Sequence, residues 1–334
     1  MSRTVLVTGV ARKFASRAAR YLADLAETGP ASGRGAITRV IGVDTVVPDA
    51  DLGGVKFVRA DIRTPVIGKV IAVEDVDTVV HLDVNPSMRG RLGGSSNKEL
   101  NVIGTMQLLA ACQRASTVTK LVLGSSTAVY GTSPRDPAMF TESMAARGGV
   151  RTGFPKDMVE VEAYTRGFAR RRPDIIITTL RAAQALDVDL EMPLSMYLRA
   201  PVLPVVAGFD PRLQFVHVSD LLAVLGLAVT RDRPGTFNVA GDGVLMLSQA
   251  ARRLGRPVIP LPSLGYATAL TRIARAGGAE LPPDLHRLLK YGRVVDTTAL
   301  REVFGYEPTR TTEEIFEEFR AQVRGGVLSG IGER

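Results

Sequence analysis

The sequence predicts an α/β protein in which helices cover both faces of a doubly wound parallel sheet. In the first half of the 334 residues, short segments rich in valine, isoleucine and threonine alternate with longer helical stretches. At the start of the chain, the apolar residues Val5, Leu6 and Val7 lead through Thr8 to Gly9, directly before a helical stretch. Strands buried on both faces have this continuous apolar character. The expected strands are residues 4–8, 39–43, 55–58, 78–82, 120–123 and 175–180, and the expected helices are 13–27, 97–114 and 156–172.

The second half of the chain has a different pattern of expected helices and strands. After Arg181 prolines cluster and the helical stretches become shorter. Two segments, 213–218 and 236–239, still resemble strands and could rejoin the main sheet. We therefore expect a Rossmann-type NAD(P)-binding domain over residues 1–180 and a smaller α/β substrate lobe over residues 181–330, partly interwoven with it. A ligand would bind in the cleft between them.

Composition narrows the function classes. Cys112 is the single cysteine, so no internal disulfide can form, which fits a cytoplasmic location. No apolar run reaches the roughly 18 residues that a membrane helix needs. The net charge of +8 comes from dispersed residues, 35 of the 42 basic ones being arginine. With 5% aromatic residues and no tryptophan, the chain offers no base-stacking platform, so nucleic-acid binding is the least favoured function. The spacing of its three histidines and one cysteine predicts no metal site.

Gly9 stands between the first expected strand and a helix, an order typical of dinucleotide-binding folds. A glycine there permits a tight turn that presents the amide groups of the helix start to a pyrophosphate. The other two glycines of the usual fingerprint are replaced by Arg12 and Ala15, so a tight turn without any nucleotide is the alternative. Arg12 could crowd the pyrophosphate path. Alternatively, it could turn outward and, with Lys13, bind phosphate, and the position of both cations at the helix start favours this second interpretation.

Acidic residues follow the next two expected strands. Asp44 ends the second strand, where a carboxylate accepts hydrogen bonds from the adenosine ribose and repels a 2′-phosphate, which favours NAD over NADP. The alternative is an aspartate that only starts a loop. Because Arg12 and Lys13 favour NADP, the cofactor preference stays open. Asp61 and Ile62 follow the third strand and could reach the adenine.

A series of short motifs runs from Val5 to about Phe319. They are VVHL at 79–82, NVIGT at 101–105, GSSTAVYG at 124–131, LR at 180–181, FVHVSD at 215–220, FNVAG at 237–241 and FGYEP at 304–308. In this order they resemble the NAD-dependent epimerase/dehydratase family, the extended short-chain dehydrogenases that include UDP-glucose 4-epimerases. The resemblance implies NAD or NADP as cofactor and an isomerase or oxidoreductase reaction on a nucleotide sugar. It also implies that Leu82, Asp83 and Asn101 contact the cofactor.

The family's catalytic residues can be placed by position. Ser126, with Thr127 beside it, matches the serine or threonine that hydrogen-bonds the reacting sugar hydroxyl. Lys156 matches the lysine that holds the nicotinamide ribose, but the tyrosine four residues before it is replaced by Thr152. A nearby ammonium can lower the pKa of a tyrosine from about 10 towards neutrality, whereas a threonine hydroxyl is far too weak an acid. Two interpretations remain: an enzyme with altered chemistry, and a non-catalytic cofactor or metabolite binder with a regulatory or scaffolding role.

Other positions also depart from the family pattern. Asp83 stands where a small alanine would let the cofactor lie close, so its carboxylate could bond the ribose or obstruct it. Gln184 follows the LR motif where the family carries aromatic and asparagine residues. Gln184, Arg212 and Arg293 are the candidates for substrate contact, since arginines are natural clamps for a diphosphate. The expected partners are a dinucleotide and an anionic small molecule such as a nucleotide sugar, and a homodimer is one assembly that the chain could form.

Overall fold

The computed structural model describes residues 3–29, 35–84, 99–144, 153–190, 192–276, 282 and 285–329. Its central element is a seven-stranded parallel sheet with the strand order β11-β6-β5-β4-β1-β2-β3. The strands are β1 (Arg3–Thr8), β2 (Ile37–Asp44), β3 (Lys56–Arg59), β4 (Thr78–His81), β5 (Lys120–Ser126), β6 (Ile176–Ala182) and β11 (Gly235–Val239). The strand order reverses between β1 and β4, and ligands of such sheets bind beyond the carboxyl ends of the strands at this point.

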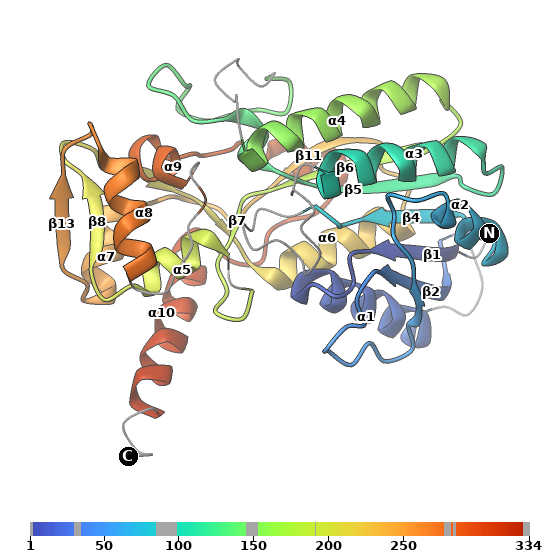
Figure 1. Ribbon diagram of the computed structural model, residues 1–334, viewed down its shortest axis with the longest axis horizontal. Helices are drawn as coiled ribbons and strands as arrows, with labels where there is room; N and C mark the ends of the chain where they lie inside the picture. The colour runs from blue at the N-terminus through green and yellow to red at the C-terminus, as the bar shows by residue number, and fades with distance from the viewer. Residues whose placement is uncertain are drawn as a thin grey trace.

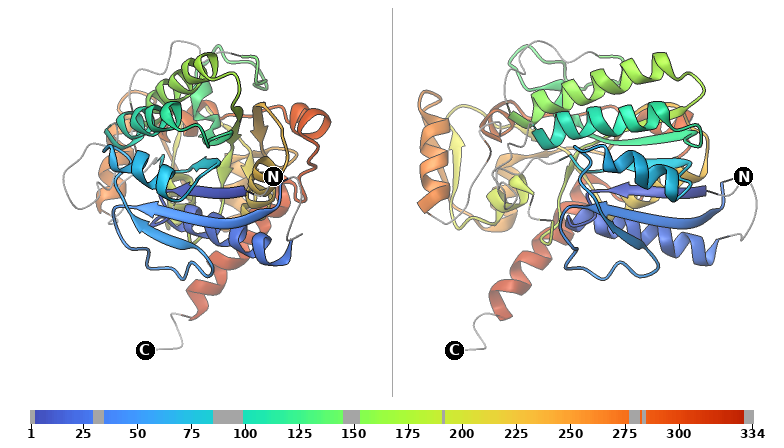
Figure 2. Two further views of the ribbon diagram at one scale, coloured as in Figure 1. Left: turned by 90° about the vertical axis from the view of Figure 1, so that its right-hand side faces the viewer. Right: turned by 45° about the vertical axis from the view of Figure 1, so that its right-hand side comes forward.

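Helices cover both faces of this sheet (Figure 1). One face carries α1 (Lys13–Thr28) and α6 (Val218–Thr230), and the other carries α2 (Val66–Val73), α3 (Gly104–Arg114) and α4 (Gly153–Arg171). A π-helical turn, η1 (Glu99–Ile103), leads into α3, and a 3-10 turn, η2 (Thr127–Tyr130), follows β5. The turned views in Figure 2 show the sheet between the two helical layers. The predicted fold class, a Rossmann-type α/β sheet, is confirmed.

The second half of the chain builds a smaller lobe beside the carboxyl ends of the strands (Figure 1). Its strands form three short pairs: β7 (Gln184–Ala185) with β10 (Phe215–Val216), β8 (Leu203–Val206) with β13 (Val258–Leu261), and β9 (Arg212–Leu213) with β12 (Leu245–Met246). Its helices are α5 (Pro193–Arg199), α7 (Leu247–Leu254), α8 (Tyr266–Ala276), α9 (Leu285–Tyr291) and α10 (Thr312–Ser329). The π-helical turn η3 (Leu300–Phe304) packs instead on β11 of the main sheet, where Phe304 contacts Phe237. The expected strand 213–218 is therefore divided between β9, β10 and the start of α6, outside the main sheet, whereas β11 does join that sheet.

The lobe has an apolar core of its own. Tyr197 and Tyr266 are buried in it, and both hydroxyls donate to the carbonyl of Pro204, at 2.7 and 2.8 Å. Phe215 of β10 stacks against Phe316 of α10, which attaches α10 to this core. Among the helices of the described residues, none is both long and apolar enough to cross a membrane.

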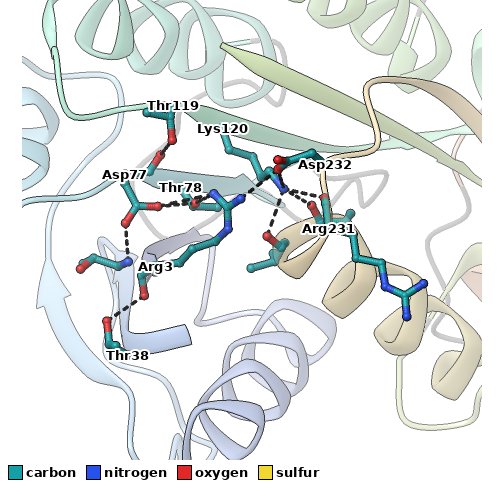
Figure 3. Close-up of polar contacts among 11 residues, drawn as sticks. Arg3, Thr38, Asp77, Thr78, Thr119, Lys120, Arg231 and Asp232 are labelled. Atoms are coloured by element: carbon teal, nitrogen blue, oxygen red, sulfur yellow. Dashed lines mark hydrogen bonds and ion pairs between the residues drawn. The ribbon is translucent and has the colours of Figure 1, made fainter. Parts of the chain in front are cut away.

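A buried lysine connects the end of α6 to the edge of the sheet at which the strands begin, on the side away from the lobe (Figure 3). The Lys120 side chain is fully buried, and its ammonium donates to three carbonyls at the end of α6, those of Ala228, Val229 and Arg231, at 3.2, 3.2 and 2.6 Å. It also lies 3.0 Å from a carboxylate oxygen of Asp232. Cations at a helix carboxyl end are stabilised by the helix dipole and by the terminal carbonyls. Lys120 therefore joins β5 to α6.

Two more charged residues complete this cluster, which we call the Lys120 cluster. Arg3 of β1 lies 2.9 Å from Asp232 and donates to the Thr78 hydroxyl of β4 (Figure 3). Asp77 accepts a hydrogen bond from the backbone amide of Thr4 at 2.6 Å. The cluster thus connects the amino ends of three neighbouring strands with α6, at the edge of the sheet remote from the cleft.

Candidate functional site

A cavity of about 430 Å³ lies at the carboxyl ends of the strands, between the sheet and the lobe. This size is within the range of small-molecule sites. Most of its lining is apolar, and its polar side chains are those of Arg12, Lys13, Ser125, Ser126, Gln184 and Arg293. Leu82 at the end of β4, Leu221 and Leu225 of α6, and Leu285 and Leu288 of α9 belong to the apolar wall. The cavity therefore brings together residues of the turn before α1, the ends of β4 and β5, and the lobe.

The turn before α1 has the geometry that its sequence predicts. Gly9 has a φ of +80°, in the left-handed region that favours glycine. A β-carbon on Gly9 would lie 2.9 Å from the Asp83 Cα, so the backbone after β4 passes very close to this turn. The amide of Arg12 donates to the Gly9 carbonyl at 3.0 Å, and α1 starts at Lys13. The helix start thus borders the cavity.

Arg12 and Asp83 form an ion pair at this turn. A guanidinium nitrogen of Arg12 lies 2.9 Å from Asp83 Oδ1, with side chains 20% and 5% exposed. Arg12 lines the cavity as well. The structure thus directs Arg12 to a neighbouring carboxylate, whereas the interpretation favoured from the sequence turned it outward.

Asp44 is almost fully buried at the end of β2 and supports this turn from the side. One of its carboxylate oxygens accepts the amide of Ala11 at 3.0 Å, and the other accepts the amide of Val46 at 3.2 Å. Ala11 belongs to the cavity wall. Asp44 therefore fixes the backbone next to the cavity, and its contact with an adenosine ribose stays a prediction.

We expect Asp44→Ala to lower the free energy of unfolding by about 1 to 3 kcal/mol, because two amides lose a charged acceptor. Urea denaturation measures this change. Asp189→Ala is the matched control, since the Asp189 side chain is 64% exposed and pairs with the Arg17 guanidinium, a contact worth at most about 1 kcal/mol. An equal loss in both variants would contradict the supporting role of Asp44.

Three other predicted cofactor residues lie in packing positions. Asp61 bonds the amide and guanidinium of Arg63. Ile62 is buried in the core under α2 and α3. Asn101 of η1 is fully buried and donates to Asp157 of α4 at 3.1 Å. None of these three is among the described residues that line the cavity.

A chain of hydrogen bonds fixes the backbone that follows β4. The Thr8 hydroxyl accepts the amides of Leu82 and Asp83, at 3.1 and 3.2 Å, and lies 2.8 Å from His81 Nδ1. His81 Nε2 in turn lies 2.8 Å from the Thr105 hydroxyl of α3. Burial, helped by the charge of Arg12, lowers the pKa of His81 to about 3, so the imidazole is neutral. A neutral imidazole accepts at one nitrogen and donates at the other, as this chain requires.

Helix α4 presents Phe154 and Met158 to the cavity. They are four residues apart and so lie on one face of the helix. Lys156 is midway between them in sequence and therefore lies on a different side. Its side chain is 43% exposed, and its ammonium lies 3.6 Å from Glu160. Lys156 is thus not among the described residues that line the cavity, and Thr152 lies outside the described residues.

Ser126 borders the cavity at the end of β5, where its hydroxyl accepts the amide of Ala128 at 3.2 Å and starts η2. Thr127 is buried beside a much smaller adjoining hollow. Gln184 and Arg293 line both spaces, and Arg293 also donates to the Gly131 carbonyl at 3.1 Å. Arg212 is not among the described lining residues, and its carbonyl accepts the amide of Arg293.

A buried polar network supports the β5 side of the cavity. Ser125, which lines the cavity, donates to Glu162 of α4 at 2.6 Å. Both carboxylate oxygens of Glu162 accept from Arg181 of β6, at 2.9 and 2.7 Å. Arg181 also donates to the Tyr130 hydroxyl, which donates to Asn238 of β11. This network joins α4 to the strands on which Ser125 and Ser126 stand.

The sequence profile of the NAD-dependent epimerase/dehydratase family matches residues 5–240. The chain belongs to this family. The match spans every strand of the main sheet, from β1 to β11. The family therefore accounts for the sheet and for the motifs around the cavity.

Several known proteins are similar to this chain. An uncharacterised protein of Mycobacterium tuberculosis is 45% identical over 323 residues, which cover 95% of this chain and 83% of that protein. The UDP-glucuronic acid 4-epimerase of Bacillus cereus, solved with UDP-glucuronic acid and NAD, has a TM-score of 0.69 at 17% identity and covers 96% of this chain and 99% of its own. The dTDP-glucose 4,6-dehydratase DesIV of Streptomyces venezuelae, solved with NAD and TYD, has a TM-score of 0.70 at 21% identity, with 96% and 97% covered. At these identities the two solved structures show a shared fold.

Phe154 and Met158 are the site residues that the sequence prediction missed. Their four-residue spacing is the spacing that the family resemblance implies for its tyrosine and lysine, and the same spacing separates Thr152 from Lys156. The lysine at position 156 is what makes the second pair resemble the family pattern. In the structure the pair Phe154 and Met158 lines the cavity. In this family member, an aromatic ring and a thioether occupy that face of α4.

Proposed function

We propose that this epimerase/dehydratase family member binds NAD in the cavity, with an anionic small molecule of the nucleotide-sugar class beside it, and does not turn that molecule over. The family assignment, the switch point of the sheet and the tight Gly9 turn support binding of a dinucleotide. Related folds have been solved with NAD and UDP-glucuronic acid. When bound, NAD would supply hydride-transfer chemistry. Lys13 and the start of α1 would face its phosphates, while Gln184 and Arg293 would face the second molecule.

The single observation that carries the absence of turnover is the pair Phe154 and Met158 on the cavity wall. General acid–base catalysis requires a group that exchanges a proton within hydrogen-bond reach of the substrate. A phenyl ring and a thioether carry no exchangeable proton and no charge. Among the described residues of α4 that line the cavity, none could move a proton, and this supports a binder over an enzyme.

Ser126 favours a second candidate function, an enzyme with altered chemistry, because its hydroxyl borders the cavity at the place that the family uses for substrate contact. The test is incubation of the protein and NAD with UDP-glucose, UDP-glucuronic acid and dTDP-glucose, followed by mass spectrometry and NMR of the sugars. We expect no conversion above the protein-free sample. If the wild-type protein converts a sugar and Ser126→Ala does not, the proposal of a non-catalytic binder is wrong and the protein is an enzyme.

Two lysines give a matched test of where the dinucleotide binds. Lys13 starts α1 at the cavity, so we expect Lys13→Ala to weaken NAD binding roughly tenfold, the loss of one charge-assisted hydrogen bond. Lys156 lies on another side of α4 with Glu160, so Lys156→Ala should leave the Kd within about twofold. Isothermal titration calorimetry measures both. A tenfold loss in Lys156→Ala would show that this lysine holds the ribose after all.

A further inference from the structure

Apolar side chains from α4 and from the lobe line one part of the cavity, which we call the α4–α9 wall. Phe154 and Met158 of α4 belong to it, together with Leu285 and Leu288 of α9 and Leu190 of the segment between β7 and α5. Apart from the weakly accepting thioether of Met158, these side chains neither donate nor accept hydrogen bonds. A polar ligand group that is pressed against this wall therefore loses its bonds to water without replacement.

The cavity also offers few acceptors to the hydroxyl groups of a sugar. No aspartate or glutamate is among the described residues that line it. Ser125, Ser126 and Gln184 carry all the side-chain oxygens of the described lining. The Ser126 oxygen already accepts a backbone amide, and the Ser125 hydroxyl donates its proton to Glu162. The protons of sugar hydroxyls thus find side-chain acceptors on the side of β5 and Gln184, away from the residues of the α4–α9 wall.

A fully hydroxylated sugar matches this lining poorly. A hexose such as glucose carries hydroxyl groups around its ring, and each of them both donates and accepts. A hydroxyl that turns towards α4 or α9 would be buried against carbon and sulfur, and a buried polar group without a partner opposes binding. Replacing that hydroxyl by hydrogen removes the penalty and keeps the apolar contact.

We propose that the α4–α9 wall selects a second molecule that is poor in hydroxyl groups, which among nucleotide sugars means a deoxygenated sugar. The proposal rests on the proposed function, because it concerns the second molecule named there. The polar side of the sugar meets Ser126 and Gln184, and Arg293 holds its anionic group. An apolar pocket discriminates against a ligand that only adds a hydroxyl by up to roughly a hundredfold. The wall therefore distinguishes sugars that share the same nucleotide.

The experiment is calorimetric titration of UDP-glucose and of its 4-deoxy and 6-deoxy derivatives, with and without NAD. Each derivative lacks a single hydroxyl and keeps the nucleotide. We expect at least one of them to bind the wild-type protein roughly tenfold more tightly than UDP-glucose. Octyl phosphate and glucose 6-phosphate form a second pair, an apolar and a hydroxylated anion without a nucleotide. Octyl phosphate should bind at least roughly tenfold more tightly than glucose 6-phosphate.

Two variants test the wall itself. Phe154→Tyr and Met158→Gln nearly keep the size of the side chain and place a hydrogen-bonding group in the wall. We expect one or both to reduce the two preferences to roughly threefold or less, because a hydroxyl then finds a partner. Phe209→Tyr is the matched control, since Phe209 is 40% exposed, packs edge-on against Tyr291 and is not among the described lining residues. It should keep the wild-type preferences, and melting temperatures show whether each variant is folded.

The outcomes separate this proposal from the proposed function. A preference for a deoxy derivative that Phe154→Tyr or Met158→Gln reduces supports both. If no UDP-sugar binds, but octyl phosphate is preferred and the variants reduce that preference, the selection by the wall is supported and the nucleotide-sugar class is wrong. If UDP-glucose binds as tightly as both deoxy derivatives, the proposal is overturned and the nucleotide-sugar ligand stands. Preferences that neither variant changes also overturn it, as does the failure of every ligand to bind.

Discussion

Replacing Glu162 by leucine should lower the free energy of unfolding by about 3 to 5 kcal/mol, the usual cost of removing one partner from a buried ion pair. The pair of Glu162 and Arg181 is almost completely shielded, with side chains 5% and 9% exposed. The substitution leaves the Arg181 guanidinium without its bidentate acceptor, and the Ser125 hydroxyl loses its acceptor as well. Guanidinium chloride denaturation, followed by circular dichroism, measures the loss.

The double variant Glu162→Leu, Arg181→Met provides the control. It removes both charges together, so no buried charge is left unpaired, and we expect it to recover more than half of the stability lost by Glu162→Leu alone. Losses that simply add would mean that the two side chains contribute independently. That result would contradict the ion pair as the centre of the network beneath Ser125.

Replacing Lys120 by methionine should lower the free energy of unfolding by about 3 kcal/mol at pH 7, again as the loss of one partner of a buried pair. Methionine fills a similar volume but donates no hydrogen bond. The three carbonyls at the end of α6 then lose their donor, and Asp232 loses its nearest lysine. Asp232 is 28% exposed and can be hydrated, which places the expected loss at the low end of the range for buried pairs. A loss below about 1 kcal/mol would contradict the conclusion that Lys120 stabilises the contact between β5 and α6.

The same lysine predicts a pH dependence. Burial lowers the pKa of Lys120 from 10.5 to about 8. Between these two values the unfolded chain binds more protons at this residue than the folded chain does. Stability therefore rises with pH from about 8 to about 10. The rise should be smaller in Lys120→Met, and denaturation curves at pH 7, 8, 9 and 10 compare the two proteins; identical slopes would contradict the assignment.

The sheet could be predicted from the sequence because its signals are local. All six predicted strands occur, since a parallel strand covered on both faces must be apolar along its whole length, as Val5, Leu6 and Val7 are. The start of α4 was placed three residues too late, because its first turn holds Gly153 and Pro155, which interrupt an apolar pattern. The short segment 213–218 carried the same apolar signal as a sheet strand, and its actual pairing with β7 and β12 depends on contacts far away in sequence.

The site could be predicted only in part. The sequence places Ser126 by a local motif and Arg293 by a simple charge argument, and both line the cavity. Which side of α4 faces the cavity depends on how the helix packs on the sheet, and in the structure Phe154 and Met158 line the cavity while Lys156, between them, is not among the described lining residues. Arg12 and Asp83 were each noted as departures from small residues. That they compensate one another could not be deduced from positions 71 apart in the chain, and it required the 2.9 Å contact.

Helix α6 is fastened at both ends and lines the cavity near its first turns. At its start His217 accepts the amide of Ser219 and lies 3.4 Å from Glu318 of α10, and at its end the carbonyls hold Lys120. We therefore expect α6 to move little at this wall of the cavity, and its backbone amides to exchange slowly with deuterium. The segment that carries Asp187 and Asp189 is tied to α1 through the partly exposed Arg17, and its neighbour Leu190 also lines the cavity. That segment is thus attached to α1 by partly exposed ion pairs, which can be exchanged for water at small cost.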